Sequence, residues 1–198
     1  LVEIGSGGGF VKEIISNITT SDVVSGLGID KVFTAEKMPF RKNSVSSFVM
    51  LNVFHHIKNP KKAISEMQRC LKKTGKIVMI EPWNAPWAKF IYQNFHHETF
   101  DPKAGWEIKG KGRLTDANGA IPWIIFKRDK VVFENMFPCL KITKISPHTP
   151  IAYIISGGLS KPQLLPNFTY PLVELIEKIL SPLNKFLGMF ATIVIEKK

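Results

Sequence analysis

Three glycines at every second position, directly after a short apolar run, are the first residues in this sequence that point to chemistry. Val2-Glu3-Ile4 is followed by Gly5, Gly7 and Gly9, and then by residues 11–15 in a helical pattern. A strand that leads through a glycine turn into a helix is typical of the nucleotide-cofactor corner of a doubly wound α/β sheet. Glycine lets the backbone turn tightly and lets a ligand approach where a Cβ would collide. We therefore predict a cofactor site at this turn.

The spacing of the glycines argues against a dinucleotide. The fingerprint G-x-G-x-x-G needs its third glycine where this sequence has Phe10, whereas the pattern acid-x-G-x-G-x-G is present from Glu3 onward. A carboxylate beside the cofactor repels a pyrophosphate but favours a cationic ligand, such as an amino-acid ammonium near a sulfonium. On this motif alone, the alternative is a glycine turn that binds no ligand.

This stretch resembles motif I of the class I S-adenosylmethionine-dependent methyltransferases, and three later stretches follow in that family's order. Residues 35–40 resemble the segment D-A-x-x-L-P-F, residues 52–56 resemble D-x-x-H-H, and residues 76–82 are similar to the family's fifth strand and the turn after it. The resemblance is to the small-molecule, type 11-like branch and covers residues 1–83. Thr34 stands where the family has the acid that reads the adenine amino group, so adenine recognition is expected to rest on backbone groups around Ala35.

The resemblance implies S-adenosylmethionine as cofactor and gives each part of it a place. The methionyl part is expected at the glycine turn, the adenine near residues 35–36, and the methyl end near residues 52–53. Asp22, nineteen positions after Glu3, is expected on the ribose hydroxyls, with Asp30 as the second candidate because it opens the next strand. The predicted cofactor-binding residues are Glu3, Gly5, Ser6, Gly7, Gly9, Asp22, Ala35, Glu36, Asn52 and Val53.

Two adjacent histidines, His55 and His56, are the predicted catalytic residues. They follow the fourth strand at the sheet edge where ligands bind in open α/β sheets, and histidine has a pKa suited to accepting a proton from the acceptor. We expect His55 to face the substrate. For His56, bracing the helix that follows is an equal alternative.

No metal site is predicted. Asn52, His55 and His56 resemble a polar triplet that some quinone-type O-methyltransferases are thought to use around a divalent ion, but Asn52 stands in the place of an acid. A second polar cluster comprises His96, His97, Glu98 and Asp101. No further spaced set completes a zinc site with it, so a structural role is favoured over a substrate lid, and a lid over a metal.

The helices and strands that must hold these residues can be predicted most clearly in the first half of the chain. Strands are predicted at residues 2–4, 30–34, 45–51 and 76–80, and a short second strand is predicted to end at Asp22. The segment 23–28 is too short and too rich in glycine for a full crossover helix. A helix should begin with Asn59 as N-cap and Pro60 at its first position and end at Thr74-Gly75. Further helices are predicted at 87–95 and 129–137, and strands at 140–145 and 191–196.

Together these elements predict a Rossmann-like, doubly wound seven-stranded α/β sheet, mostly parallel with the last strand antiparallel. We assign residues 1–198 to a single domain that lacks its N-terminal part, because the chain starts inside the first motif. A proline-rich insertion around residues 146–187, with an amphipathic helix at 172–180, should lie on the substrate side. The default expectation for that helix is packing on the sheet, and peripheral membrane contact is the alternative.

Composition limits the classes of partner. The net charge is +11, but the lysines are scattered (Lys72-Lys73, 109–113, 127–130, Lys197-Lys198), so a solvated basic surface is favoured over a nucleic-acid footprint. No apolar run approaches the length of a membrane span. Cys70 and Cys139 are predicted to be reduced core thiols, which favours a cytoplasmic location.

The predicted function is therefore methyl transfer from S-adenosylmethionine to a small-molecule acceptor of apolar or lipid-like character, with no prediction of oligomeric state. An RNA-directed methyltransferase is one alternative, suggested by the charge, although no N-P-P-Y-like tetrapeptide is present. A non-catalytic cofactor-binding relative is the other, suggested by Thr34 and by the abbreviated second crossover.

Overall fold

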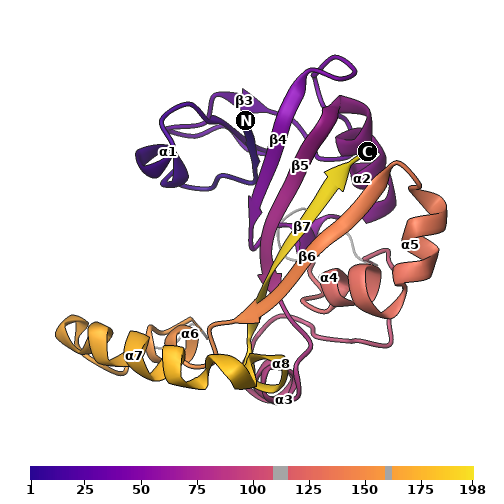
Figure 1. The fold of residues 1–198 in the computed structure, drawn as a ribbon. Coiled ribbons are helices and arrows are strands. Elements are labelled where there is room, and N and C mark those ends of the chain that lie inside the picture. The colour runs from indigo at the N-terminus through magenta and orange to yellow at the C-terminus, as the bar shows by residue number, and fades with distance from the viewer. Residues whose placement is uncertain (109–115, 159–161) are drawn as a thin grey trace.

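The computed structural model describes residues 1–108, 116–158 and 162–198, and within these the strands form one seven-stranded sheet (Figure 1). The strand order is β3-β2-β1-β4-β5-β7-β6; β1 to β5 pair in parallel, and β7 runs antiparallel between β5 and β6. The predicted fold class is confirmed. The strands are β1 Val2–Ile4, β2 Thr19–Asp22, β3 Lys31–Val32, β4 Val45–Leu51, β5 Leu71–Pro82, β6 Leu140–His148 and β7 Phe190–Lys197.

The two central strands form the core and set the position of the site. Phe48 and Met50 of β4 are fully buried beside Ile77 and Met79 of β5, as expected of strands covered on both faces. The parallel register pairs Leu51 with Ile80. The residues that follow β4 therefore emerge next to the carboxyl end of β5, at the edge where open α/β sheets bind ligands.

Helices cover the sheet and extend beyond one of its ends (Figure 1). Asn59 caps the helix after β4 as predicted, because its Oδ1 accepts the Lys62 N–H at 2.8 Å. The helices are α1 Val11–Ile14, α2 Pro60–Cys70, α3 Pro86–Phe95, α4 Ile121–Trp123, α5 Lys130–Met136, α6 Ala152–Ile155, α7 Tyr170–Leu180 and α8 Asn184–Leu187, with single turns η1 Phe54–His56, η2 Ile124–Arg128, η3 Asn167–Thr169 and η4 Ser181–Leu183.

Two predicted boundaries differ from the structure. The helix expected to reach Thr74-Gly75 ends at Cys70, because Leu71 already pairs with Val45 of β4 and so belongs to β5. Thr74 takes a left-handed φ of 61° where the pairing of β4 with β5 shifts register, between Leu71 and Lys76. The third strand is two residues long rather than five, because it pairs with β2 only at its start and Thr34 then turns back to bridge Lys37.

The predicted helix at 172–180 is present as part of α7, but it does not pack on the sheet. In Figure 1 it runs sideways beyond the end of the sheet, next to α6. Val173 is buried, while Leu172, Leu175 and Ile179 are 59%, 53% and 67% exposed. The Glu177 carboxylate accepts the N–H groups of Ile151 and Ala152, which ties α7 to the start of α6 instead. Peripheral membrane contact through this apolar face stays a prediction.

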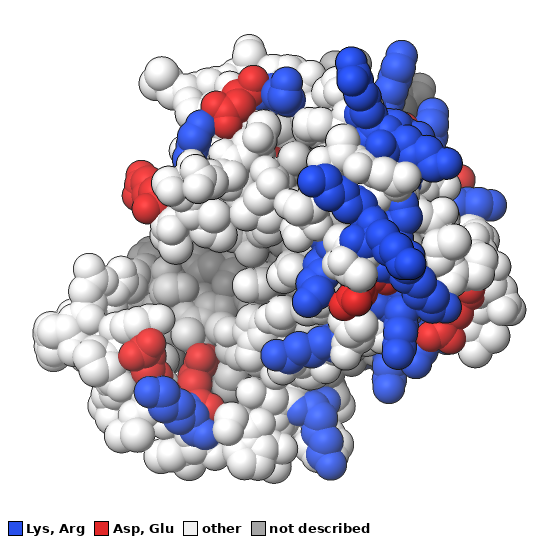
Figure 2. Space-filling model, turned by 45° about the horizontal axis from the view of Figure 1, so that its top comes forward, with Lys and Arg blue, Asp and Glu red and all other residues white. Residues whose placement is uncertain are grey.

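Positive charge is distributed unevenly over the surface. In Figure 2 lysines and arginines gather on the side where α2, α5 and the C-terminus lie, whereas the side with α7 is mostly uncharged. The basic stretch 109–113 lies outside the described residues.

Cys70 is buried as predicted, but Cys139 is exposed rather than a core thiol, because it lies in the turn just before β6. Among the described residues, no helix is both long and apolar enough to cross a membrane.

Candidate functional site

The glycine turn after β1 adopts the backbone that its sequence predicts. Gly5, Gly7 and Gly9 have φ of 71°, 52° and 73°, in the left-handed region that favours glycine. At Gly5 a Cβ would also lie 2.5 Å from Val53 Cγ2. The alternation of glycines therefore follows from backbone geometry, and the turn packs directly against the segment after β4.

A pocket of about 430 Å³ opens between this turn and the loops after β2, β3 and β4. Asp22 stands at its edge, where its carboxylate accepts the N–H groups of Gly7 at 3.0 Å and Val23 at 2.7 Å. Asp30, the second candidate for the ribose, is not among the residues that line the pocket and instead pairs with Lys12 at 2.7 Å. Six of the ten predicted cofactor residues line this pocket: Gly5, Asp22, Ala35, Glu36, Asn52 and Val53.

Glu3 and Ser6 are not among the residues that line this pocket. The Ser6 hydroxyl accepts the Ser21 N–H at 3.0 Å, which joins the turn to β2. Glu3 is 2% exposed, and its Oε2 has no hydrogen-bond partner among the described residues. Burial raises the pKa of Glu3. The hydrogen bond with Ser6 opposes this shift, and the negative charge of Asp22 adds to it. A buried acceptor without a donor fits the ammonium group of a methionyl cofactor.

The loop that carries Ala35 and Glu36 is fastened to α2 by hydrogen bonds from its backbone to an ion pair on that helix, Glu66 and Arg69. Glu66 accepts the Met38 N–H at 2.9 Å and pairs with Arg69, whose guanidinium donates to the carbonyls of Met38 and Phe40. Hydrogen bonding to Arg69 lowers the pKa of Glu66 to about 2. Burial opposes this shift, and the hydrogen bond from Met38 adds to it. The pair thus fixes one wall of the pocket.

We expect Glu66→Ala to lower the free energy of unfolding by about 1 kcal/mol at pH 7, because a partly exposed charged hydrogen-bond network is lost. The folded pKa of Glu66 lies below its unfolded value of 4.5, so this contribution is full above pH 4.5 and disappears as the pH falls towards 2. Urea denaturation at pH 7, 5 and 3 measures it. Glu134→Ala, which breaks an exposed pair with Lys130, is the control with a change below about 0.5 kcal/mol. A difference for Glu66→Ala that persists undiminished at pH 3 would contradict the assignment.

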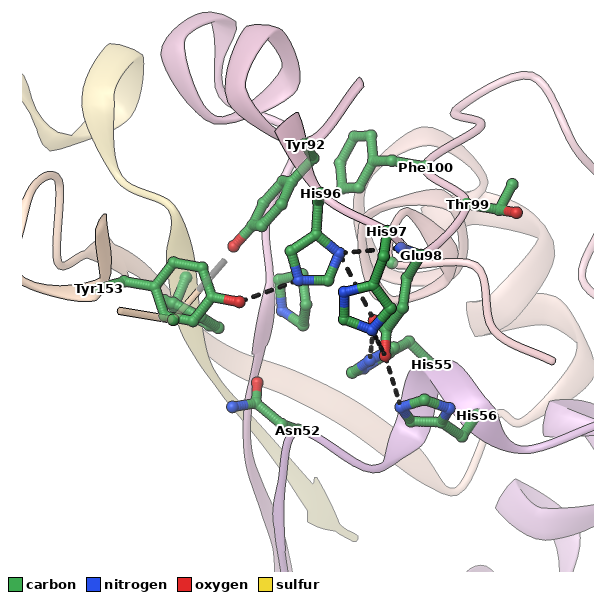
Figure 3. Close-up of a pocket in the computed structure, with 14 residues that line it drawn as sticks. Asn52, His55, His56, Tyr92, His96, His97, Glu98, Thr99, Phe100 and Tyr153 are labelled. Carbon is green, nitrogen blue, oxygen red and sulfur yellow. Dashed lines mark hydrogen bonds and ion pairs between the residues drawn. The ribbon is translucent and has the colours of Figure 1, made fainter. Parts of the chain in front are cut away.

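A second pocket, of about 290 Å³, meets the first one at Asn52 and His56, which line both (Figure 3). Asn52 directly follows β4 with a left-handed φ of 56°, and its N–H donates to the Ile80 carbonyl at 2.9 Å. This turn directs the chain from the glycine-side pocket to the histidines. Two cavities that share a wall at a sheet edge are suited to hold a group donor and a group acceptor side by side.

Aromatic side chains form one wall of this second pocket: Tyr92, Phe100, Tyr153 and Phe190. The Tyr92 hydroxyl donates to the Met189 carbonyl at 2.8 Å, and the Tyr153 hydroxyl is 2.9 Å from His96 Nε2. Burial raises the pKa of Tyr153 to about 12, with the charge of Glu98 acting in the same direction. The four tryptophans of the chain line neither pocket, and Trp83 is part of the buried core.

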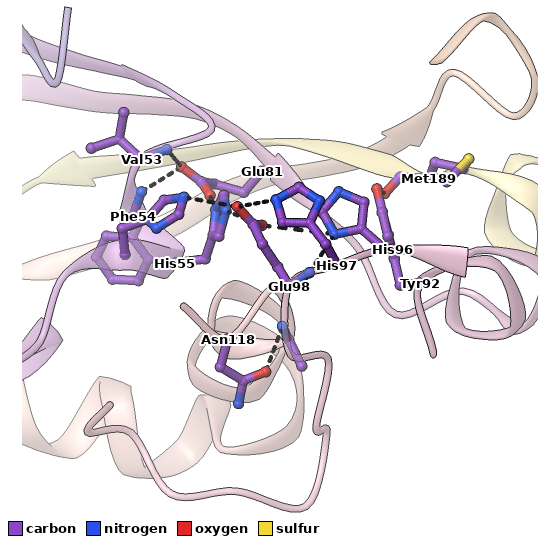
Figure 4. A network of polar contacts seen from close by, with 12 residues as sticks. Val53, Phe54, His55, Glu81, Tyr92, His96, His97, Glu98, Asn118 and Met189 are labelled. Atoms are coloured by element: carbon purple, nitrogen blue, oxygen red, sulfur yellow. Dashed lines mark hydrogen bonds and ion pairs between the residues drawn. The ribbon is translucent and has the colours of Figure 1, made fainter. Parts of the chain in front are cut away.

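The polar side chains that line this pocket include His55, which is paired with Glu81, a buried residue that does not line it (Figure 4). Glu81, at the end of β5, is fully buried; it accepts the N–H groups of Val53 and Phe54 and lies 2.6 Å from His55 Nδ1. Burial acts most strongly on His55 and disfavours its charge, but the carboxylates of Glu81 and Glu98 outweigh it and raise the pKa of His55 to about 9. His55 is thus a cation held in place at neutral pH.

The two predicted catalytic histidines differ in a way the sequence did not indicate. His55, expected to face the substrate, is 2% exposed and bound to Glu81. His56 is more open, lies at the junction of the two pockets, and has its pKa lowered by burial and then by the charge of His55. Its neutral imidazole is therefore the better placed of the two to accept a proton.

The histidine-rich stretch after α3 lies against these residues. His96, His97 and Glu98 line the second pocket, and the Glu98 carboxylate lies within 4 Å of all four histidines in this region (Figure 3). Its hydrogen bond with His55 lowers the pKa of Glu98 to about 2, although burial acts to raise it. Asp101, grouped with them in the sequence, is not among the lining residues. Sequence reasoning missed Glu81, although its place at the end of the strand next to His55 was a usable signal.

Comparison with known proteins relates part of the sequence to one family. Residues 2–79 match a family described as a methyltransferase domain, of type 11. No curated protein matches the sequence. The predicted resemblance to the methyltransferases of this type is thereby confirmed for residues 2–79.

Solved structures extend the likeness to the whole chain. An S-adenosylmethionine-dependent methyltransferase from Thermotoga maritima has a TM-score of 0.60 at 16% identity, covering 100% of this chain and 81% of that one. One from Archaeoglobus fulgidus has a TM-score of 0.59 at 17% identity, covering 100% and 85%. Geranyl diphosphate C-methyltransferase from Streptomyces coelicolor, in complex with Mg²⁺, geranyl diphosphate and S-adenosylhomocysteine, has a TM-score of 0.54 at 14% identity, covering 99% and 69%. At these identities the likeness establishes the fold.

Proposed function

We propose that this chain, which has the class I methyltransferase fold, transfers a methyl group from S-adenosylmethionine to a small-molecule acceptor. The observation that carries the proposal is the pair of pockets joined at Asn52 and His56, one next to the glycine turn and the other lined by aromatic and histidine side chains. The adjacency supplies what methyl transfer needs, because an in-line displacement depends mainly on orienting donor and acceptor and on excluding water.

The cofactor side is assigned residue by residue. Asp22 would hold the ribose hydroxyls, residues 35 and 36 the adenine, and the glycine turn with Glu3 behind it the methionyl part. When bound there, S-adenosylmethionine supplies a methyl group on a sulfonium that is already a good leaving group. The chain's own contribution is to orient this group towards Asn52 and Val53.

The acceptor side indicates a compact molecule with an apolar or aromatic part and a polar reacting group. The cavity of about 290 Å³ suits a small molecule, and its aromatic wall faces a wall of histidines. His55 and His56 remain the proposed catalytic residues: His55 presents a positive charge to the reacting group, and His56 accepts its proton. We propose a cytoplasmic location on the basis of the two unpaired cysteines.

A basic face favours a second candidate, an RNA-directed methyltransferase. The lysines and arginines in Figure 2 gather over the side with α2 and α5, whereas the acceptor cavity is lined by neutral aromatics, histidines and Glu98. RNA binding would give a strong dependence on salt. The non-catalytic alternative predicts cofactor binding without methyl transfer to any acceptor.

Calorimetric titration with S-adenosylhomocysteine and, separately, with NAD tests the cofactor assignment. We expect saturable binding of S-adenosylhomocysteine only, and a loss of about 10- to 100-fold in affinity for Asp22→Ala, because hydrogen bonds to a carboxylate disappear. Asp30→Ala is the matched control and should stay within about twofold of wild type, because Asp30 does not line the pocket. Preference for NAD, or equal losses in the two variants, would overturn the assignment.

A further inference from the structure

Three side chains from two separate segments bring possible metal ligands together in the acceptor pocket. His55 Nε2 lies 3.4 Å from one Glu98 oxygen, and His56 Nε2 lies 3.6 Å from the other. One ligand atom from each of these residues can be chosen so that all lie within 4.8 Å of one another. Ligands held about 2.0–2.2 Å from one ion are themselves about 3–3.6 Å apart, so little movement is needed to enclose one.

The surroundings of His55 are those of a supported ligand. Glu81 holds its Nδ1 at 2.6 Å, and Glu81 is fixed in turn by the N–H groups of Val53 and Phe54 (Figure 4). A carboxylate on the far nitrogen of a histidine sets the ring orientation and directs the other nitrogen at the ion. Two carboxylates, Glu81 and Glu98, therefore flank this histidine with negative charge that suits a dication.

His96, which follows α3, is engaged differently. His96 Nδ1 accepts the Glu98 N–H at 3.1 Å, and its Nε2 lies 2.9 Å from the Tyr153 hydroxyl, so both ring nitrogens have other partners. These contacts fix the backbone of Glu98 and thereby its carboxylate. The donor set is two imidazoles and one carboxylate on one side, with the pocket on the other, which leaves positions open for a ligand from the cavity (Figure 3).

We propose that His55, His56 and Glu98 form a binding site for a divalent first-row transition metal ion, with Glu81 as the positioning residue for His55. Imidazole ligands favour zinc, cobalt or iron over magnesium and calcium. The bound ion would face the acceptor pocket and hold an oxygen or nitrogen of the acceptor there. Metal ligation needs neutral imidazoles, so the ion would displace the proton of His55, occupy His56 and supply the positive charge itself. The roles proposed above for these two histidines are therefore those of the metal-free protein. That last role rests on the proposed function, whereas the site itself does not.

The test uses tag-free full-length protein, stripped with a chelator and titrated with Zn²⁺ by calorimetry. One equivalent should bind per chain, and Co²⁺ should give a visible absorption band that reports its coordination. His56→Ala and Glu98→Gln should each weaken Zn²⁺ binding at least about 100-fold, because a ligand is lost. His148→Ala is the matched control and should keep the wild-type affinity, since His148 bonds to Thr149 and Thr192 and does not line the pocket.

No saturable Zn²⁺ binding to the wild type, or undiminished binding in both ligand variants, would overturn the site. Saturable Mg²⁺ binding without Zn²⁺ binding would overturn the class of ion. Circular dichroism confirms that the variants are folded. S-adenosylhomocysteine titrations of wild type and Glu98→Gln separate the two proposals, because Glu98 lines only the acceptor pocket: zinc binding without nucleoside binding would leave the metal site standing and remove the methyltransferase assignment.

Discussion

Gly5→Ala should reduce the affinity for S-adenosylhomocysteine by about 100-fold or more. Gly5 has a left-handed φ of 71°, and a Cβ there would lie 2.5 Å and 2.6 Å from the two γ-carbons of Val53. The backbone strain alone is worth about 1–2 kcal/mol for a residue with a Cβ. Relief of the collision moves the turn away from the segment after β4, so both walls of the cofactor pocket are displaced together. Calorimetric titration measures the loss.

Gly8→Ala is the matched control for this prediction. Gly8 lies in the same turn, but its φ is not positive and a Cβ on it would meet nothing within 4 Å. We expect an affinity within about twofold of wild type, because neither strain nor collision arises. If the two variants lose affinity equally, the turn responds to any added side chain and the role assigned to Gly5 is wrong.

Glu81→Gln should destabilise the metal-free protein by about 3–5 kcal/mol, the range for removing one partner of a buried ion pair. Glu81 is fully buried and accepts two backbone N–H groups and the His55 Nδ1–H. A glutamine can accept from the backbone, but its amide cannot balance the imidazolium next to it. Chemical denaturation of wild type and variant at pH 7 measures the change.

Two further variants show whether the pair itself is responsible. Glu196→Gln removes a carboxylate that lies 3.9 Å from Lys76 at the surface, and it should cost less than about 0.5 kcal/mol. The double variant His55→Asn/Glu81→Gln should cost at least about 1 kcal/mol less than the sum of the two single changes, because neither residue is then left alone. Simple additivity would show that His55 and Glu81 are not coupled.

Most of the elements were predictable because their causes are local. The apolar run at 45–51 is β4, and the pair Asn59-Pro60 starts α2. Errors occurred where pairing overrode local preference, as at the end of α2, where Leu71 joins β5. The amphipathic pattern of α7 identified a helix correctly, but its surroundings depend on the tie between Glu177 and the start of α6, which no pattern along the chain records.

The sequence by itself determined the glycine turn and the order of the motifs, because a left-handed backbone and a strand pattern are properties of neighbouring residues. It also named His55, His56 and the stretch 96–98, but as two unrelated groups. Only the tertiary structure decided that these groups share one cavity, that Glu81 holds His55, and that the two adjacent histidines differ in charge. The physical reason is that these contacts depend on the register of β4 and β5 and on how the segment after α3 folds back, and both are set by packing between distant parts of the chain.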